Sequence, residues 1–243
     1  MRHGGRVGEN IVLWTLVIMG SLNSLAIALS YAFVLKPPTA NKIQARSYTL
    51  RDLNARMPTV LMNIGLLVIL TVTSLSMFGD LFVWTAQPWW KTTLEVLLIS
   101  LVDDAFFYVF HRSLHENKWL YRKIHKIHHK AFTPVPVEYI YVHPLEWMGG
   151  SLGIVLGVLV LMAFQGGEVS AVTFLIYSAI RNFHELDIHS GIRSKVLPTL
   201  FPFIGSAEHH DKHHSRPNSG NYGSTYMLWD KVMGTVSTEE KKG

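Results

Sequence analysis

The chain of 243 residues contains no cysteine, which excludes disulfide bonds and metal sites built from thiolates. Charge is also scarce, because only 16% of the residues are charged whereas 49% are hydrophobic. The formal net charge is +5, but the basic residues lie beside apolar runs and form no patch interleaved with aromatic residues. No nucleic-acid motif is present either, so nucleic acid is not expected among the partners.

Two apolar runs are long enough to cross a membrane, for which about 20 apolar residues are needed. They are residues 11–35 and 60–77. Arg2 and Arg6 precede the first run, but no small-residue cleavage site follows it, so we expect an uncleaved anchor. Residues 1–90 are therefore predicted to form N-terminal membrane anchor helices.

Three further apolar runs are less regular. Residues 94–110 carry two aspartates near their end and lead directly into a histidine-rich segment. Residues 151–164 and 169–180 are each too short to cross comfortably, and a Gln-Gly-Gly-Glu turn separates them. We expect a shallow membrane-embedded hairpin at about 150–183, with two tilted spans as the alternative. The predicted fold class is all-α, an integral-membrane helical bundle with three to five membrane-embedded helices.

The distribution of Lys and Arg predicts the orientation of this bundle. If the first three runs cross and the hairpin enters and leaves on one side, Arg2, Arg6 and Lys91 lie opposite the histidines. The other nineteen Lys and Arg residues then lie on the histidine side. Cytoplasmic loops carry an excess of positive charge, so the histidine-rich segments are predicted to face the cytoplasm.

Most of the 13 histidines fall into three short boxes with similar spacing. The boxes are His111-Arg-Ser-Leu-His115, His125-Lys-Ile-His128-His129 and His210-Asp-Lys-His213-His214. Residues three and four apart project from one face of a helix, so each box can present its imidazoles to a shared volume. Neutral imidazole binds zinc, copper, iron and nickel. Eight such groups exceed the four ligands of a closed structural zinc site, which indicates two metal ions.

Two more histidines lie in the segment His184-Glu-Leu-Asp-Ile-His189. A zinc-protease helix requires histidines four residues apart, whereas these are five apart and point about 140° away from each other on a helix. A metalloprotease is therefore disfavoured. His189 is well placed where the hairpin returns to the histidine side, and His184 joins the site only if the helix ends or bends there.

Asp104 precedes His111 by seven residues and His115 by eleven, both close to whole numbers of helical turns. A carboxylate that accepts the N–H of a ligating imidazole fixes its tautomer, and we expect Asp104 to do this. The alternative is an ordinary aspartate at the membrane edge. Asp103 points about 100° away from Asp104 and serves as a control position.

His209 and His143 are candidates for supporting positions. His209 points about 100° away from His210 on a helix, so we expect it to orient a ligand rather than bind metal. His143 precedes a proline and could be a ligand, a substrate-pocket donor or a loop residue. Further carboxylates that the sequence does not rank are Glu138, Glu146, Glu185 and Asp187.

The number of histidines also indicates which metal the site holds. Zinc has no redox chemistry, and hydrolysis usually needs only three protein ligands. Eight or more histidines at a membrane surface are better suited to a pair of iron ions that activate dioxygen. Such a pair can oxidise the unactivated C–H bonds of a lipid.

Several motifs identify a family resemblance over about residues 95–236. The motifs are Asp104-Ala-Phe-Phe-Tyr-Val-Phe-His111-Arg-Ser-Leu-His115, the boxes at 125–129 and 210–214, Gly220-Asn-Tyr-Gly, Trp229-Asp and Gly234-Thr. Together they resemble the fatty acid hydroxylase and sterol desaturase superfamily. Within it, Glu138-Tyr with His143-Pro-Leu-Glu, and Asp187-Ile-His-Ser-Gly, are most similar to the C4-methylsterol oxidases.

The resemblance implies a membrane-bound non-haem di-iron oxygenase, in which a helical bundle carries a cytosolic histidine-rich cap within a hydroxylase domain at residues 91–243. The ligands it implies are His111, His115, His125, His128, His129, His189, His210, His213 and His214, with His184 as a tenth candidate at a position where related sequences vary. The expected cofactor is two iron ions, which zinc can replace in purified protein.

Substrate and reaction stay open at this point. The expected reaction is O2-dependent oxidation of a sterol 4-methyl group, with fatty-acyl or sphingoid hydroxylation and desaturation as alternatives. A non-enzymatic metal-binding or transport protein is a remote alternative, because transport favours ligands at the membrane midplane and these histidines follow the ends of the apolar runs. The expected membrane is the endoplasmic reticulum in a eukaryote or the inner membrane in a bacterium.

The resemblance also implies electrons from a separate protein. No cytochrome b5 signature His-Pro-Gly-Gly is fused, since His143-Pro144 continues as Leu-Glu, and no nucleotide-binding glycine fingerprint precedes a helix. A separate cytochrome b5, ferredoxin or reductase is therefore expected. A basic surface that could dock an acidic donor consists of Lys118, Arg122, Lys123 and Lys126.

Overall fold

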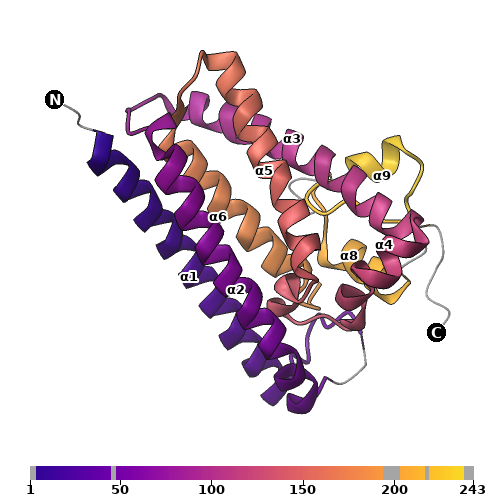
Figure 1. The fold of residues 1–243 in the computed structure, drawn as a ribbon. Helices are drawn as coiled ribbons and strands as arrows, with labels where there is room; N and C mark the ends of the chain where they lie inside the picture. The colour runs from indigo at the N-terminus through magenta and orange to yellow at the C-terminus, as the bar shows by residue number, and fades with distance from the viewer. Residues whose placement is uncertain (1–3, 45–47, 194–202, 217–218, 238–243) are drawn as a thin grey trace.

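The computed structural model describes residues 4–44, 48–193, 203–216 and 219–237 (Figure 1). The long helices are α1 (Gly4–Leu35), α2 (Leu50–Phe78), α3 (Trp89–Glu116), α5 (Pro144–Gln165) and α6 (Ala171–Ile188). The short helices are α4 (Lys118–Lys123), α8 (Ala207–Ser215), α9 (Leu228–Val232) and the 3-10 turns η1 (Gly79–Leu81), η2 (His125–Lys130) and η3 (Pro136–Ile140). Two-residue strands β1 (Phe82–Val83) and β2 (Val169–Ser170) complete the described structure.

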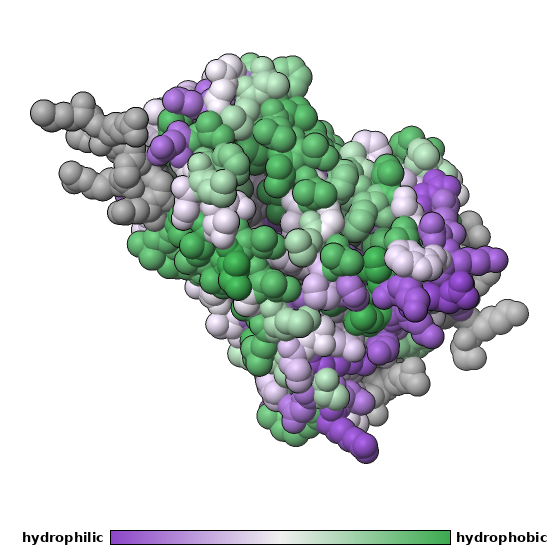
Figure 2. All heavy atoms as spheres, in the orientation of Figure 1, coloured by the Kyte–Doolittle hydropathy of each residue, from purple (hydrophilic) through white to green (hydrophobic). Residues whose placement is uncertain are grey.

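The five long helices form a bundle in which α1 packs on α2 and α6, and α3 packs on α5 and α6 (Figure 1). Three stretches are long and apolar enough to cross a membrane, namely Asn10–Leu35, Leu50–Leu81 and Pro144–Gln165. Their outward side chains are mostly Leu, Val and Ile, which gives the bundle an apolar surface (Figure 2). The predicted all-α membrane bundle is therefore confirmed.

Helix α5, the first helix of the α5–α6 hairpin, is longer than the sequence predicted. Helix α5 begins at Pro144, seven residues before the expected run, and reaches a length of 22 residues. At its far end, Phe82 pairs with Val169 and Val83 with Ser170 in a parallel arrangement. This pairing places the tip of the α5–α6 hairpin beside the turn between α2 and α3. Helix α5 is thus long and apolar enough to cross a membrane, unlike the expected run 151–164, whereas the membrane-embedded hairpin at about 150–183 stays a prediction.

Glycines in α5 allow it to approach α3 closely. A Cβ atom at Gly157 would lie 2.9 Å from the carbonyl oxygen of Ile99, and one at Gly153 would overlap the Asp103 side chain. Small residues at such positions let membrane helices pack backbone against backbone. This contact fixes the position of α3, which carries the first histidine box.

The segments that connect the helices at the opposite end form a cap. Asn63 in α2 donates from Nδ2 to the carbonyl oxygens of Ile140 and Val142, each at 2.9 Å, which fastens η3 to the bundle. Lys42 and Ile192 form an isolated antiparallel bridge, which joins the loop after α1 to the segment after α6. All three histidine boxes therefore lie at one end of the bundle (Figure 1).

Candidate metal centre

Nine histidines converge into two groups of ring nitrogens inside the cap. The five-histidine group consists of His111, His115, His125, His129 and His213. The four-histidine group consists of His128, His189, His210 and His214. Within each group the nitrogens that face inward lie within 4.8 Å of one another, and all nine side chains are buried. Each group could hold a metal ion.

The second and third boxes are each divided between the two groups. In η2, His125 and His129 enter the five-histidine group, whereas His128 enters the other. In α8, His213 enters the five-histidine group, and the four-histidine group receives the remaining two histidines of the box. Neither of these two boxes therefore serves a single ion. Because η2 and α8 each contribute histidines to both groups, the two groups must form together.

The distances between Nε2 atoms match those expected around a common ion. They run from 2.7 Å between His115 and His125 to 3.5 Å between His128 and His189, and the others lie between 2.9 and 3.2 Å. Two neighbouring nitrogens bound to one ion at about 2.0–2.1 Å are separated by about 2.8–3.4 Å in octahedral or tetrahedral geometry. The donor set and its spacing thus fit a metal ion in each group.

Burial keeps these rings neutral. It lowers the pKa of His125 and His128 to about 3 and that of His189 to about 4, because a charged imidazolium is poorly solvated in the cap. The pKa values of His213 and His214 are also shifted well below the ordinary value by burial. Neutral imidazole is the form that binds metal.

Oxygen acceptors on the outer ring nitrogens fix the tautomer of several histidines. Nδ1 of His111 donates to the Tyr222 carbonyl oxygen at 2.7 Å, and Nδ1 of His213 donates to the Gly220 carbonyl oxygen at 2.9 Å. Nδ1 of His189 donates to the Glu185 carbonyl oxygen at 2.7 Å. With the proton on Nδ1, the lone pair of Nε2 points inward. Several such lone pairs facing one another require a cation between them.

Among the described residues, Glu146 is the carboxylate that forms a hydrogen bond with a histidine of the two groups. Its Oε1 accepts from Nδ1 of His125 at 2.8 Å, and both side chains are buried. Because α5 begins at Pro144, Glu146 lies in its first turn and points back toward η2. The sequence suggested Glu146 only as one of four unranked carboxylates, since the contact depends on where α5 begins.

Asp104 has a different role from the predicted one. Its two carboxylate oxygens accept from the backbone N–H groups of Thr225, at 2.8 Å, and Tyr226, at 3.2 Å. His111 is seven residues away, about 10 Å along the helix, which is too far for a direct hydrogen bond. Asp104 therefore holds the C-terminal segment against α3 and does not orient His111 or His115.

Asp103 is not an inert control position either. Its Oδ2 accepts from Nε of Arg181 at 2.5 Å and from the hydroxyl of Tyr177. The Asp103 side chain is buried between α3 and α6, where it forms an ion pair across the bundle. The helical wheel predicted its direction but not its partner.

His209 supports the site through an aspartate. Its Nε2 lies 3.1 Å from Oδ2 of Asp230, and it belongs to neither histidine group. Burial opposes ionisation of Asp230, but its hydrogen bonds with His209, Thr235 and backbone hold its pKa below the ordinary value. Asp230 accepts a hydrogen bond from the backbone N–H of Tyr222, and the carbonyl oxygen of Tyr222 accepts one from Nδ1 of His111.

His184 and His143 also lie outside both groups. Helix α6 continues past His184 to Ile188, so His184 stays on a different face from His189, and Nε2 of His184 lies 3.2 Å from the Ser224 carbonyl oxygen. The side chain of His143 caps α5 by accepting the backbone N–H of Leu145 at 3.1 Å. The condition under which His184 was expected to join the site is therefore not met.

The motif Gly220-Asn221-Tyr222-Gly223 supplies contacts that the sequence did not assign. Gly220 and Asn221 both have positive φ angles, of 99° and 59°, and a Cβ atom at Gly220 would collide with the Thr235 carbonyl oxygen. Asn221 donates from Nδ2 to the His209 carbonyl oxygen at 3.0 Å. The resulting turn directs the carbonyl groups of Gly220 and Tyr222 at two histidines.

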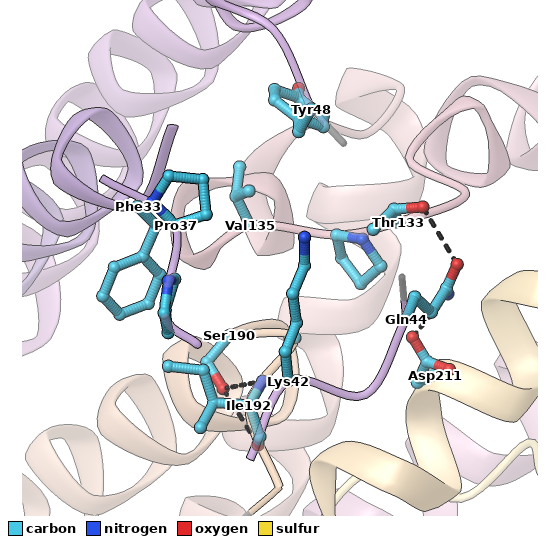
Figure 3. Close-up of a pocket in the computed structure, with 13 residues that line it drawn as sticks. Phe33, Pro37, Lys42, Gln44, Tyr48, Thr133, Val135, Ser190, Ile192 and Asp211 are labelled. Carbon is cyan, nitrogen blue, oxygen red and sulfur yellow. Dashed lines mark hydrogen bonds between the residues drawn. The ribbon is translucent and has the colours of Figure 1, made fainter. Parts of the chain in front are cut away.

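A small cavity of about 40 Å³ is lined by the loop that follows α1 and by Ser190 and Asp211 (Figure 3). Gln44 lies at one side of it, donating to Oδ1 of Asp211 at 2.5 Å and accepting from the Thr133 hydroxyl at 3.0 Å. Asp211 follows His210 in α8. The loop thus ties α8 to the segment after η2.

The fold and site define a membrane-embedded helical bundle whose cap presents two metal-competent histidine groups. Residues 96–235, more than half of the chain, match the fatty acid hydroxylase family model, and the chain belongs to this family. This assignment confirms the resemblance inferred from the motifs.

Curated relatives carry two kinds of name. The chain is 36% identical over 151 residues to the methylsterol monooxygenase erg25A of Aspergillus fumigatus, which covers 62% of this chain and 49% of the relative. It is 34% identical over 154 residues to methylsterol monooxygenase 1 of Rattus norvegicus, covering 63% and 50%. It is also 34% identical over 152 residues to the very-long-chain aldehyde decarbonylase GL1-8 of Oryza sativa, covering 61% and 54%. The chain thus spans about half the length of these relatives. No solved structure matches it.

Proposed function

We propose that the protein is a membrane-bound non-haem di-iron oxygenase that uses O2 to oxidise a C–H bond of a lipid. The observation that carries this proposal is the division of nine buried histidines into two groups of inward-facing nitrogens. The proposed ligands are the nine members of the two groups, with His184 excluded from the set. When bound, a pair of iron ions supplies the oxidation of an unactivated C–H bond by dioxygen.

The residues of the chain do the binding and positioning. The Nδ1 atoms of His111 and His213 are held by backbone oxygens, so their Nε2 atoms are presented in fixed directions. Glu146 raises the basicity of His125 through its carboxylate. Buried residues of η3, including Val137 and Ile140, exclude water from this part of the cap.

The proposed substrate is a sterol, oxidised at its 4-methyl group. Two methylsterol monooxygenases among the relatives support this choice. The aldehyde decarbonylase is nearly as similar, so fatty-acyl or sphingoid hydroxylation and desaturation are retained as alternatives. A transport protein is disfavoured because both histidine groups lie in the cap rather than at mid-bundle (Figure 1).

We propose further that the cap faces the cytoplasm, of the endoplasmic reticulum in a eukaryote or of the inner membrane in a bacterium. Electrons come from a separate cytochrome b5, ferredoxin or reductase. The basic residues Lys118, Arg122, Lys123 and Lys126 are exposed on the cap, which supports docking of an acidic donor.

Metal analysis tests the centre. Protein purified without chelator is expected to hold close to two metal ions per chain, and zinc can replace iron because imidazole binds both. His128→Ala and His213→Ala each remove a ligand from a different group, so each single variant should lose about half of the metal and the double variant nearly all. His184→Gln is the matched control and should retain both ions. Active protein with one stable zinc ion would refute the two-metal proposal.

The reaction is tested with the full chain in lipid vesicles, loaded with iron and supplied with a reductase system. A 4-methylsterol, a fatty acid, a sphingoid base and a long-chain aldehyde are offered separately under ¹⁸O2. We expect one ¹⁸O atom in the product of the methylsterol, lost in the double histidine variant. Turnover of another lipid instead would select one of the alternatives. Accumulation of a precursor lipid in a deletion strain provides the independent check.

A further inference from the structure

The C-terminal part of the cap exposes several large apolar side chains. Val232 is 67% exposed, Phe203 56%, Met233 54% and Val236 41%. They lie in or beside α9, where Figure 2 shows apolar surface next to the hydrophilic part of the cap. Exposed apolar surface of this kind usually marks contact with a protein or a membrane.

Hydrogen bonds fix this segment beside α3 rather than above it. Asp104 accepts the backbone N–H groups of Thr225 and Tyr226, and the Tyr226 hydroxyl lies 2.9 Å from the Ser100 hydroxyl. At the other end of the segment, the Thr235 hydroxyl lies 2.9 Å from that of Tyr108. The stretch that contains α9 therefore runs along α3 between residues 100 and 108 (Figure 1).

The contact between α3 and α5 gives the depth of this stretch. Asp103 lies against Gly153 of α5, and Ile99 lies against Gly157. Gly153 is nine residues into the apolar span that begins at Pro144, which corresponds to about 13 Å along the helix axis. The hydrocarbon core of a bilayer is about 30 Å thick. From Asp104 the segment runs toward the cap, because Thr235 lies beside Tyr108 and the neighbouring Phe107 lies against Gly150, only six residues into the same apolar span. Helix α9 therefore lies closer than Asp104 to the end of α5 where the apolar span meets the cap.

We propose that α9 and its flanking residues are inserted into the interfacial layer of the bilayer, with lipid covering Val232 and Met233. Backbone groups close to the hydrocarbon core must be hydrogen-bonded, and Asp104 and Asp230 accept four of the N–H groups next to α9. Lys231 extends its ammonium over the Phe203 ring at 5.2 Å, a position from which it can reach lipid headgroups.

Membrane contact of α9 would connect the bilayer to the histidine groups. Asp230 belongs to α9 and accepts the backbone N–H of Tyr222, whose carbonyl oxygen holds His111. The segment that orients His111 would then contact the lipid surface through α9. A lipid substrate leaving the bilayer at this point needs to travel only a short way to the cap.

The absence of cysteine allows a direct measurement of depth. Val232→Cys and Met233→Cys variants of the full chain are labelled with an environment-sensitive fluorophore and reconstituted in phosphatidylcholine vesicles. Some vesicles carry nitroxide lipids labelled near the headgroup and others near the end of the acyl chain. Both labels should show a blue shift in lipid and lose more fluorescence with the shallow nitroxide than with the deep one.

Two positions calibrate the measurement. Leu156→Cys, on the outward face of α5, should be quenched most by the deep nitroxide, and Lys123→Cys, on the exposed cap, by neither. Behaviour of the α9 labels like that of Lys123→Cys would overturn the proposal. Protection from both nitroxides that disappears on dilution of the protein in lipid would overturn it too, because a second copy would then cover the surface. Neither outcome depends on metal or turnover, so the proposed function is tested separately.

Discussion

Nδ1 of His125 lies 2.8 Å from Oε1 of Glu146, which links the second histidine box to the first turn of α5. The contact joins a cap segment to a membrane helix. It also places a hydrogen-bonded carboxylate behind one histidine, whereas the other Nδ1 hydrogen bonds described among the nine are to backbone oxygens. Loss of this charge should therefore affect one group more than the other.

Glu146→Gln keeps the shape of the side chain but removes the charge that polarises His125. We expect a decrease of about 10-fold to 100-fold in metal affinity or turnover, measured by competition with a chelator and by substrate oxidation. The five-histidine group should release its metal first. Glu116→Gln, at an exposed position on α3, is the control and should behave as the unsubstituted protein. Equal losses of metal affinity or turnover in both variants would show that Glu146 does not act through His125.

Helical spacing predicted the centre in part. It identified the boxes, because histidines three and four apart had to share a face, and it separated His184 from His189 by their five-residue spacing. It did not predict that His128 and His129, adjacent in the chain, enter different groups. Adjacent side chains on a helical turn point about 100° apart, but the group that each of them enters depends on how η2 packs against the surrounding segments, which has no local signal.

The partners of the aspartates could not be predicted either. Asp104 falls on the same helical stripe as His111, but a stripe gives direction and not distance along the axis. Its carboxylate oxygens accept hydrogen bonds from the backbone N–H groups of Thr225 and Tyr226, which are more than 120 residues away in the chain. The length of α5 was underestimated, since the glycines near the start of α5 interrupt the apolar run without ending the helix.

The buried ion pair between Asp103 and Arg181 should be important for stability. Breaking a buried pair by changing one partner typically costs about 3–5 kcal/mol, so Asp103→Asn and Arg181→Gln should each strongly destabilise the protein. The double variant should lose less than the sum of the two, which a double-mutant cycle of unfolding measures. The exposed pair Arg112 and Glu116 is the control and should show coupling below about 1 kcal/mol. Additive effects at Asp103 and Arg181 would show that the two charges are independent.

Gly157 should be required for the approach of α5 to α3. A Cβ atom there would lie 2.9 Å from both the carbonyl oxygen and Cγ2 of Ile99, so Gly157→Ala should destabilise the bundle by about 1–3 kcal/mol. Gly65→Ala in α2 is the matched control, because nothing lies within 4 Å of its added methyl group. Alanine also favours the helix, so that variant should unfold at an equal or slightly higher denaturant concentration. Equal unfolding midpoints for both variants would contradict the packing argument.

The orientation of the cap can be measured because every introduced cysteine is unique. Ser113 and Lys123 are exposed at the cap end, and Thr85 is exposed at the opposite end, between β1 and α3. If the positively charged end faces the cytoplasm, Ser113→Cys and Lys123→Cys should resist a membrane-impermeant thiol reagent in intact cells and react after permeabilisation. Thr85→Cys should react in both conditions, which shows that the reagent reaches the outer surface. Ser237 is buried against Asn221 and would give a false negative. Labelling of Ser113→Cys from outside would place the histidines on the opposite side of the membrane from the proposed electron donor.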